Sequence, residues 1–239
     1  MFSIEFIAET TSTNDAVKSK NEPNLIIAAR KQTCGRGQKG NFWESEEEKN
    51  LTFSTIIKPD FLTLADQFYI SKIVSNSLVI TLKRYGIPAQ VKWPNDIYVG
   101  DKKICGILIE NDVTASGKML RSTIGVGLNV NQTEFLSDAP NPVSMKQLKN
   151  ADFDLQEVLS VFSKVLDLQY KTLEAGYMRE IDTYYENNLY RLNEWALFKE
   201  DDVEFKGKII KVQPTGELII EKESGESSSY IFKEVEYVI

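Results

Sequence analysis

The hydrophobic pattern of the sequence changes at about residue 195, and this change constrains the fold more than any other feature. Before it, strand-like apolar runs alternate with two stretches, 70–82 and 155–173, in which apolar residues recur at helical spacing. After it, short alternating runs are broken by turn signals, which is typical of a small barrel of hairpins. These turn signals are Gly207, Pro214-Thr215-Gly216 and Ser224-Gly225.

The 239 residues suit one large domain with a small appendage. We predict an α+β fold, with a mixed β-sheet and packed helices over 1–192 and a small β-barrel over 193–239. A helix should begin at Thr11–Asp15, a short one should lie around 180–190, and 131–150 reads as a loop. The predicted strands are 2–8, 24–31, 50–58, 89–93, 96–99, 103–111 and 119–128.

The chain contains no histidine, and this restricts its chemistry. It excludes Ser-His-Asp and Cys-His nucleophile systems, zinc sites with histidine ligands and histidine general bases. The formal net charge of −7 makes the chain a poor general binder of nucleic acid, because phosphate repels it.

Two cysteines, Cys34 and Cys105, do not make a disulfide framework in a chain of this size. Cys34 lies near Arg36 and could be a reactive thiol, although a small packing residue is the plainer interpretation. The N-terminus has no signal-peptide pattern, and no stretch approaches the roughly 20 apolar residues of a membrane span. We expect a cytoplasmic protein with no specific nucleic-acid partner and no membrane partner.

A glycine-rich basic loop, Gly35-Arg36-Gly37-Gln38-Lys39-Gly40, follows the second predicted strand and has the G-x-G-x-x-G spacing of dinucleotide-binding folds. That fingerprint needs a helix to begin at the glycines, but Asn41-Phe42-Trp43 and another strand follow, so we reject such a site. The glycines still let backbone N–H groups approach an anion, Arg36 suits a phosphate or carboxylate, and Trp43 offers a flat face for a base. The less favoured alternative for the stretch on its own is a solvated hairpin loop.

Three further segments place polar groups at the ends of predicted strands. In Lys92-Trp93-Pro94-Asn95-Asp96 the proline breaks the strand, and Asn95 and Asp96 could hold a hydrated Mg²⁺ ion. Lys103 begins an apolar strand and could point its ammonium into a cavity, although a lysine after a turn is more often solvated. Gly125 to Asn129 ends a strand where small residues would admit a ligand. The plainer alternatives are an ordinary Pro-Asn-Asp turn and a glycine-containing buried strand.

Taken together and in this order, the motifs closely resemble those of the biotin protein ligases. The resemblance covers nearly the whole chain and implies the biotin/lipoate protein ligase catalytic fold with a small SH3-like C-terminal β-barrel. Longer members of that family begin with a winged helix-turn-helix that represses transcription; this sequence begins at the first catalytic strand, so we expect no such role. The matching segments are Thr11-Ser12-Thr13-Asn14, Gln32 to Gly40 with Trp43, Lys92 to Asp96, Lys103 to Leu108, and Gly125 to Asn129.

The resemblance also implies which residues contact the substrates. The biotin contacts would be Ser12, Thr13, Asn14, Gln32, Gly35, Arg36, Gly37, Gln38, Lys103 and Gly106. The contacts to ATP or the adenylate would be Arg36, Lys39, Trp43, Lys92, Asn95 and Asn129, with Asn95 and Asp96 near Mg²⁺. Lys103, Arg36 and Asp96 would be catalytic. Some members carry an arginine at the position of Gln38, so this loop should retain the adenylate less tightly.

The implied activity joins biotin and ATP into biotinyl-5′-AMP and then passes the biotinyl group to one lysine of a biotin carboxyl carrier domain, usually that of acetyl-CoA carboxylase. ATP and Mg²⁺ are required, no tightly bound prosthetic group is expected, and the protein should be a monomer or a ligand-dependent homodimer. A lipoate or octanoyl protein ligase is the nearest alternative. A non-catalytic biotin-binding or anion-binding protein is a more distant one.

The residue types suit this reaction. A carboxylate must attack the α-phosphorus of ATP, so cations are needed to offset the repulsion of two anions. Lys103 is the better bridge because it is a compact charge on a flexible stem, and Arg36 adds a second charge. The mixed anhydride is already activated, so a lysine amine attacks it without an enzyme nucleophile. Asp96 could orient or deprotonate that amine.

Overall fold

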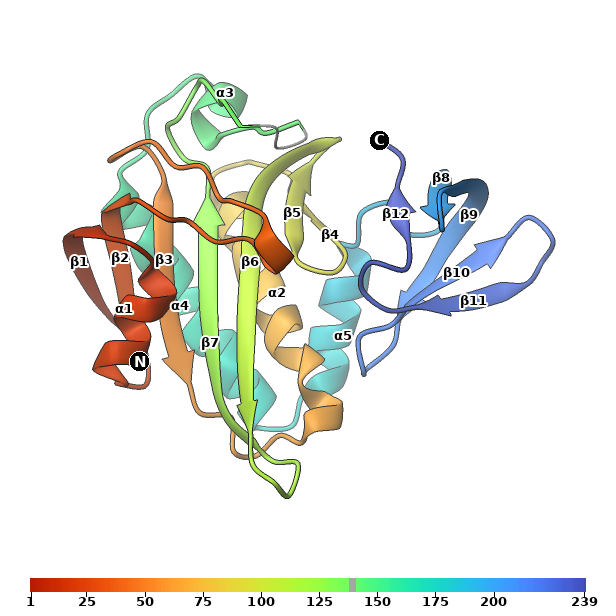
Figure 1. Ribbon diagram of the computed structural model, residues 1–239, viewed down its shortest axis with the longest axis horizontal. Coiled ribbons are helices and arrows are strands. Elements are labelled where there is room, and N and C mark those ends of the chain that lie inside the picture. Colours follow the sequence, from red (N-terminus) through yellow and green to blue (C-terminus); the bar gives the residue numbers. More distant parts are fainter. Residues whose placement is uncertain (138–140) are drawn as a thin grey trace.

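The computed structural model describes residues 1–137 and 141–239, with the side chain of Lys39 outside the description. The described part confirms the predicted α+β class, with a large mixed sheet backed by helices and a smaller antiparallel sheet beside it (Figure 1). The large sheet has the order β1-β2-β3-β7-β6-β5-β4. In that order the strands are Ser3–Thr10, Leu25–Gln32, Leu51–Ile57, Met119–Leu128, Lys102–Val113, Asp96–Val99 and Gln90–Lys92.

The helices cover the two faces of this sheet unequally. They are α1 (Thr13–Lys20), α2 (Phe68–Arg84), α3 (Met145–Lys149), α4 (Leu155–Glu174) and α5 (Met178–Asn187), with short 3-10 turns at Gln38–Gly40 and Leu64–Asp66. The helices α2, α4 and α5 form a layer behind the sheet, while α1 lies alone on the front (Figure 1). Most of the front face is therefore left to the glycine-rich loop, which crosses it.

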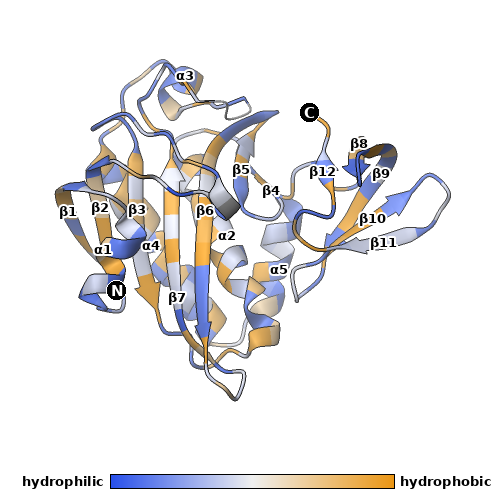
Figure 2. Cartoon of the chain, in the orientation of Figure 1, coloured by the Kyte–Doolittle hydropathy of each residue, from blue (hydrophilic) through white to orange (hydrophobic). Residues whose placement is uncertain are grey.

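The strand β3 shows why the sheet lies between two layers. All seven of its residues are buried, and successive side chains of a strand point to opposite faces. Phe53 joins the main core and packs on Phe162 of α4, with ring centroids 5.1 Å apart. Ile56 faces the other way and packs against Val17 of α1. Apolar residues accordingly concentrate on the central strands and on the inward faces of the helices (Figure 2).

Two features of the sequence favour the helix α4. The Asp154 carboxylate accepts hydrogen bonds from the backbone N–H groups of Gln156 and Glu157, at 2.7 and 3.0 Å, and so caps the first turn. Its apolar residues then recur every three or four positions and are buried against the sheet and α2.

The C-terminal strands form a five-stranded antiparallel sheet in the order β11-β10-β9-β8-β12. Its edge strands, β11 and β12, are not paired with each other in the described chain, so the predicted barrel is not closed by hydrogen bonds. The turn before β10 contacts the large sheet, where the Trp93 indole N–H donates to the carbonyl of Gly216 at 2.8 Å. The strands β8 to β12 are Trp195–Glu200, Val203–Val212, Leu218–Lys222, Ser227–Tyr230 and Glu236–Tyr237.

One local prediction was wrong. The segment 131–150, expected to be a loop throughout, contains α3. Ser144 and Gln147 form a reciprocal capping box at its start, in which each side chain bonds the backbone of the other. Pro140, one of the residues that suggested a loop, lies outside the described residues. Within the described ranges, no helix is long and apolar enough to cross a membrane.

Candidate active site

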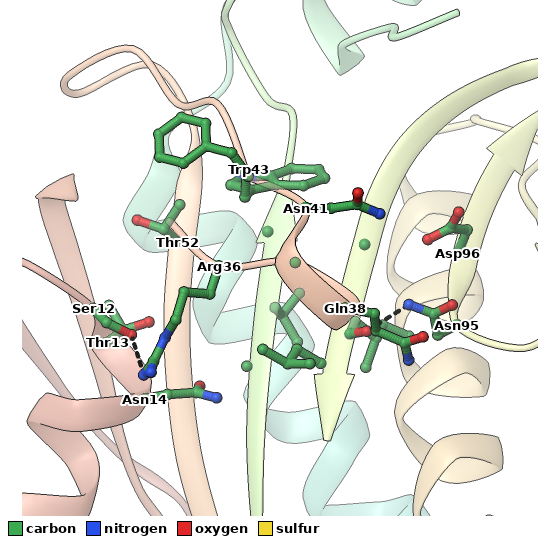
Figure 3. Close-up of a pocket in the computed structure, with 18 of the residues that line it drawn as sticks. Ser12, Thr13, Asn14, Arg36, Gln38, Asn41, Trp43, Thr52, Asn95 and Asp96 are labelled. Carbon is green, nitrogen blue, oxygen red and sulfur yellow. Dashed lines mark hydrogen bonds between the residues drawn. The ribbon is translucent and has the colours of Figure 1, made fainter. Parts of the chain in front are cut away.

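A cavity of about 230 Å³ opens on the α1 side of the large sheet (Figure 3). Its floor comes from β6 and β7, and its walls come from the start of α1, the glycine-rich loop and the turn before β5. Segments that lie far apart in the sequence therefore meet at one place. The lining residues are Ser12, Thr13, Asn14, Gln32, Arg36, Gly37, Gln38, Asn41, Phe42, Trp43, Thr52, Asn95, Asp96, Lys103, Gly106, Ile107, Leu108, Gly125, Val126, Gly127 and Phe232.

One end of the cavity carries uncharged hydrogen-bonding groups held in fixed positions. The backbone N–H and the hydroxyl of Thr13 both donate to the Gln32 amide oxygen, at 2.9 and 3.2 Å. The buried Ser54 hydroxyl lies 2.7 Å from Thr13 Oγ1 and 2.6 Å from Asn14 Oδ1. The Asn14 amide donates to Glu110 at 2.8 Å. This end can therefore offer both donors and acceptors to a small polar ring.

Three glycines of the floor allow side chains to lie directly on the strands. A Cβ at Gly125 would come within 2.4 Å of Asn14 Oδ1, and one at Gly127 within 2.2 Å of the Trp43 ring. A Cβ at Gly106 would meet the same ring at 3.0 Å. The glycines of β6 and β7 thus make room for Asn14 at one end and for Trp43 at the other.

The glycine-rich loop is itself a small hairpin. Gly37 N–H donates to the Asn41 carbonyl at 2.7 Å, and Trp43 N–H donates to the Gly35 carbonyl at 3.0 Å. A Cβ at Gly35 would lie 2.3 Å from the Trp43 carbonyl, so this close approach requires glycine. No long helix begins at the glycines, in agreement with the rejection of a dinucleotide site.

Arg36 extends from the hairpin toward the start of α1 (Figure 3). Its guanidinium pairs with Asp15 at 2.5 Å and donates to the Ser12 hydroxyl at 3.2 Å. Both members of the ion pair are about half exposed, so water screens their attraction. The arginine therefore places a positive charge, paired with Asp15, beside the uncharged groups at this end of the cavity.

The opposite side of the cavity carries Asn95 and Asp96 (Figure 3). The Lys103 ammonium lies 2.8 Å from the Asp96 carboxylate, and both side chains are largely shielded from solvent. The same ammonium lies 5.8 Å from the centre of the Trp43 ring. The Asn95 amide N–H donates to the Ile107 carbonyl at 2.8 Å, which leaves its amide oxygen as the atom able to contact a ligand.

Two buried polar atoms of cavity-lining residues have neither a hydrogen-bond partner nor an ion-pair partner among the described residues. They are Oε1 of Gln38 and Nε1 of Trp43. Buried polar atoms in proteins are rarely unpaired, and a ligand is one of the partners that can satisfy them. Both residues line the cavity, so a ligand bound there can supply the missing partners.

Most predicted site residues meet at the cavity, but four do not line it as described. Gly35 packs against the Trp43 carbonyl within the hairpin, and the side chain of Lys39 is outside the described residues. The Asn129 amide donates to the Val143 carbonyl at 3.2 Å, on the buried side of the strand end. The Lys92 ammonium lies over the rings of Tyr98 and Tyr237, and burial lowers its pKa although Asp96 opposes this shift. Ligand contact by these residues stays a prediction.

Some lining residues were not predicted. Thr52, Asn41 and Phe42 come from segments adjacent to predicted residues, and strand alternation or loop position could have indicated them. Phe232 follows β11 in the C-terminal sheet and reaches the cavity mouth only because the two sheets pack together. No local sequence signal marks it.

Comparison with known proteins agrees with this geometry. The sequence model of the biotin/lipoate A/B protein ligase family matches residues 3–129, which is more than half of the chain. The chain belongs to the biotin/lipoate A/B protein ligase family. The matched range includes every lining residue of the cavity except Phe232.

Curated proteins that are similar to this chain include biotin ligases. The bifunctional ligase/repressor BirA of Bacillus spizizenii is 26% identical over 234 residues, which cover 95% of this chain and 70% of the relative. The biotin–[acetyl-CoA-carboxylase] ligase of Paracoccus denitrificans is 28% identical over 195 residues, covering 74% of each chain.

One solved structure is similar to this chain over both of its sheets. The biotin protein ligase from Aquifex aeolicus in complex with biotin and ATP superimposes with a TM-score of 0.82 at 25% identity. The match covers 98% of this chain and 99% of that one. The predicted family and fold are thereby confirmed.

Proposed function

We propose that this protein is a biotin protein ligase, which makes biotinyl-5′-AMP from biotin and ATP and transfers the biotinyl group to a lysine of a biotin carboxyl carrier domain, that of acetyl-CoA carboxylase. The observation that carries the proposal is the layout of the cavity. A set of uncharged donors and acceptors lies at one end, a lysine ammonium lies at the other, and Trp43 packs above the glycine floor. The named similarities to biotin ligases support the same activity.

The uncharged end suits the ureido ring of biotin. That ring carries N–H donors and a carbonyl acceptor, and Ser12, Thr13 and Gln32 supply the matching partners. The aliphatic tail can then run along Leu108 and the glycine floor toward the centre of the cavity. Lipoate has no ureido group and would make none of these hydrogen bonds, so the polar set favours biotin.

Lys103 is placed to serve the first step, in which the biotin carboxylate attacks the α-phosphorus of ATP and pyrophosphate leaves. Its ammonium offsets the charge of the two anions that must meet, and a preorganised charge of this kind stabilises the transition state. The ion pair with Asp96 directs the ammonium before substrates bind. Arg36 lies at the opposite end of the cavity, paired with Asp15, and would have to leave that pair to supply a second cation to this step.

The residues at the turn before β5 fit a Mg²⁺ ion that arrives with ATP. Magnesium keeps most of its ligands as water and phosphate oxygens and takes one or two oxygens from the protein. The free amide oxygen of Asn95 and the carboxylate of Asp96 would hold it. When bound, the ion would neutralise phosphate charge.

The second step needs no enzyme nucleophile, because the mixed anhydride is already activated. The amine of the acceptor lysine attacks the biotinyl carbonyl, a C–N bond forms and AMP leaves. Asp96 lines the same cavity, and its carboxylate would orient the amine and accept its proton. Trp43 and the hairpin wall the cavity in which the anhydride would lie, which limits its hydrolysis.

A direct test compares biotin with lipoate in two assays on the same protein. Biotin should raise the melting temperature and trigger Mg·ATP-dependent release of pyrophosphate, whereas lipoate should do neither. The same results with lipoate in place of biotin would favour a lipoate ligase. Biotin binding without pyrophosphate release would favour a non-catalytic binding protein. Cytoplasmic location, the domain boundary at 192/193 and a monomeric or ligand-dependent dimeric state stay predictions.

A further inference from the structure

The carboxylate of Glu44, the residue after Trp43, binds a segment that is distant in the sequence. Its two oxygens accept hydrogen bonds from the backbone N–H of Leu136 at 3.0 and 3.1 Å, and from that of Ser137 at 2.7 Å. The side-chain amide of Gln132 donates to it at 3.0 Å. Three groups from the segment 132–137 therefore bind one carboxylate at the base of the glycine-rich hairpin.

Gln132 connects this carboxylate to the floor of the cavity. Its side chain is buried, and its amide oxygen accepts hydrogen bonds from the Asn50 amide at 2.5 Å and from Glu46 N–H at 3.0 Å. The Asn50 oxygen in turn accepts from Val130 N–H at 2.9 Å, just beyond the end of β7. The segments 44–50 and 130–137 are thus joined through buried amides, whose partners would be costly to remove.

Trp43 has few restraints of its own. Its indole N–H has no partner among the described residues, and its backbone N–H bonds only the hairpin, at Gly35. Its ring lies on Gly127 and Gly106 through packing. The next residue along the chain, Glu44, makes the contacts that tie this arm of the hairpin to another part of the protein.

We propose that Glu44 is a positioning residue, which holds Trp43 on the glycine floor and so shapes the nucleotide end of the cavity; this rests on the proposed function. Burial alone would raise the pKa of Glu44, but the hydrogen bonds from Ser137, Leu136 and Gln132 outweigh it and lower the pKa. The carboxylate is therefore ionised at neutral pH, when its three donors bind it most strongly.

Steady-state kinetics of pyrophosphate release test this role. Glu44→Ala should raise KM for ATP by about tenfold and KM for biotin by less than about twofold, because base stacking on an aromatic ring is typically worth a factor of about ten or more. Glu44→Gln keeps one acceptor and should restore part of the affinity for ATP. Glu47→Ala removes an exposed carboxylate of the same segment and is the matched control. Unchanged KM values, or an equal rise for both substrates, would overturn the proposal.

A second measurement needs no enzymatic activity. In a Trp195→Phe background, which removes the half-exposed tryptophan of β8, the remaining indoles are Trp43 and the buried Trp93. Acrylamide should quench the fluorescence of Glu44→Ala more strongly than that of the parent protein, because Trp43 leaves the floor. Equal quenching would overturn the proposal. Absence of biotin-dependent pyrophosphate release in the wild type would instead refute the proposed function, and the quenching result would still decide the role of Glu44.

Discussion

Replacing Gly127 by alanine should damage the nucleotide end of the site and spare the biotin end. The new Cβ would lie 2.2 Å from a ring atom of Trp43, whereas ordinary contact begins at 3.4 Å, so the ring must move by at least 1.2 Å. A misplacement of about 1 Å at a reacting site can cost about 100-fold in rate. We expect kcat/KM for ATP to fall by between about 10-fold and 100-fold. Overpacking of this kind costs about 1–3 kcal/mol of stability, so the fold should survive.

Two other glycines provide the controls for Gly127→Ala. Gly106→Ala places its Cβ 3.0 Å from the same ring, so it should have a much smaller effect on ATP. Gly125→Ala meets Asn14 Oδ1 at 2.4 Å and should raise KM for biotin instead. The assay is biotin-dependent pyrophosphate release with each substrate varied in turn, alongside thermal unfolding. If Gly127→Ala and Gly106→Ala behave alike, or if Gly127→Ala weakens biotin and ATP equally, the placement of Trp43 is wrong.

Three further predictions concern single charged or polar groups. Lys103→Ala should slow pyrophosphate release by about 10²–10³ while leaving the fold intact, and Lys102→Ala, at its exposed neighbour, should leave the rate unchanged; a Lys103→Ala rate within a few-fold of wild type would remove that lysine from the site. Gln38→Arg should slow dissociation of labelled biotinyl-AMP several-fold, since a charged hydrogen bond exceeds a neutral one by about 1 kcal/mol. An unchanged off-rate in Gln38→Arg together with a faster one in Lys39→Ala would contradict this. The pKa of Glu44 is lower in the folded protein than in the unfolded chain. The ionised Glu44 carboxylate should therefore stabilise the fold at pH values above its ordinary pKa of 4.5, and this stabilisation should be lost as the pH falls through the folded pKa. The difference in unfolding free energy between wild type and Glu44→Gln should therefore shrink in acid, and a difference that persists there would count against the lowered pKa.

Much of the fold was predictable because the chain repeats simple patterns. The helical spacing over 70–82 and 155–173 predicted α2 and α4, and both helices extend only slightly beyond those ranges. The short helix α3 was missed, although the Ser144–Gln147 capping box is a local signal for it. The open edges of the C-terminal sheet could not be predicted, because the alternation within each hairpin does not decide which strands pair at the ends.

The site was predictable where a motif lies within one short segment, as for Ser12 to Asn14 at the start of α1 and for the glycine-rich hairpin. The site was less predictable where packing between the two sheets determines the position of a side chain. Lys92 belongs to the same short motif as Asn95, yet its ammonium lies over Tyr237 of the C-terminal sheet. Phe232 reaches the cavity from that sheet with no motif at all. Such contacts depend on how distant segments dock, and local sequence patterns do not carry that information.

The central claim is that the protein attaches biotin to a carrier lysine. Its most direct test is the intact mass of an unmodified biotin carboxyl carrier domain after incubation with the protein, biotin and Mg·ATP. We expect the mass to rise by one biotinyl group, located by peptide mapping on a single lysine, and to stay unchanged without ATP. A carrier that keeps its mass with all components present, or one that gains a lipoyl group when lipoate replaces biotin, would contradict the account.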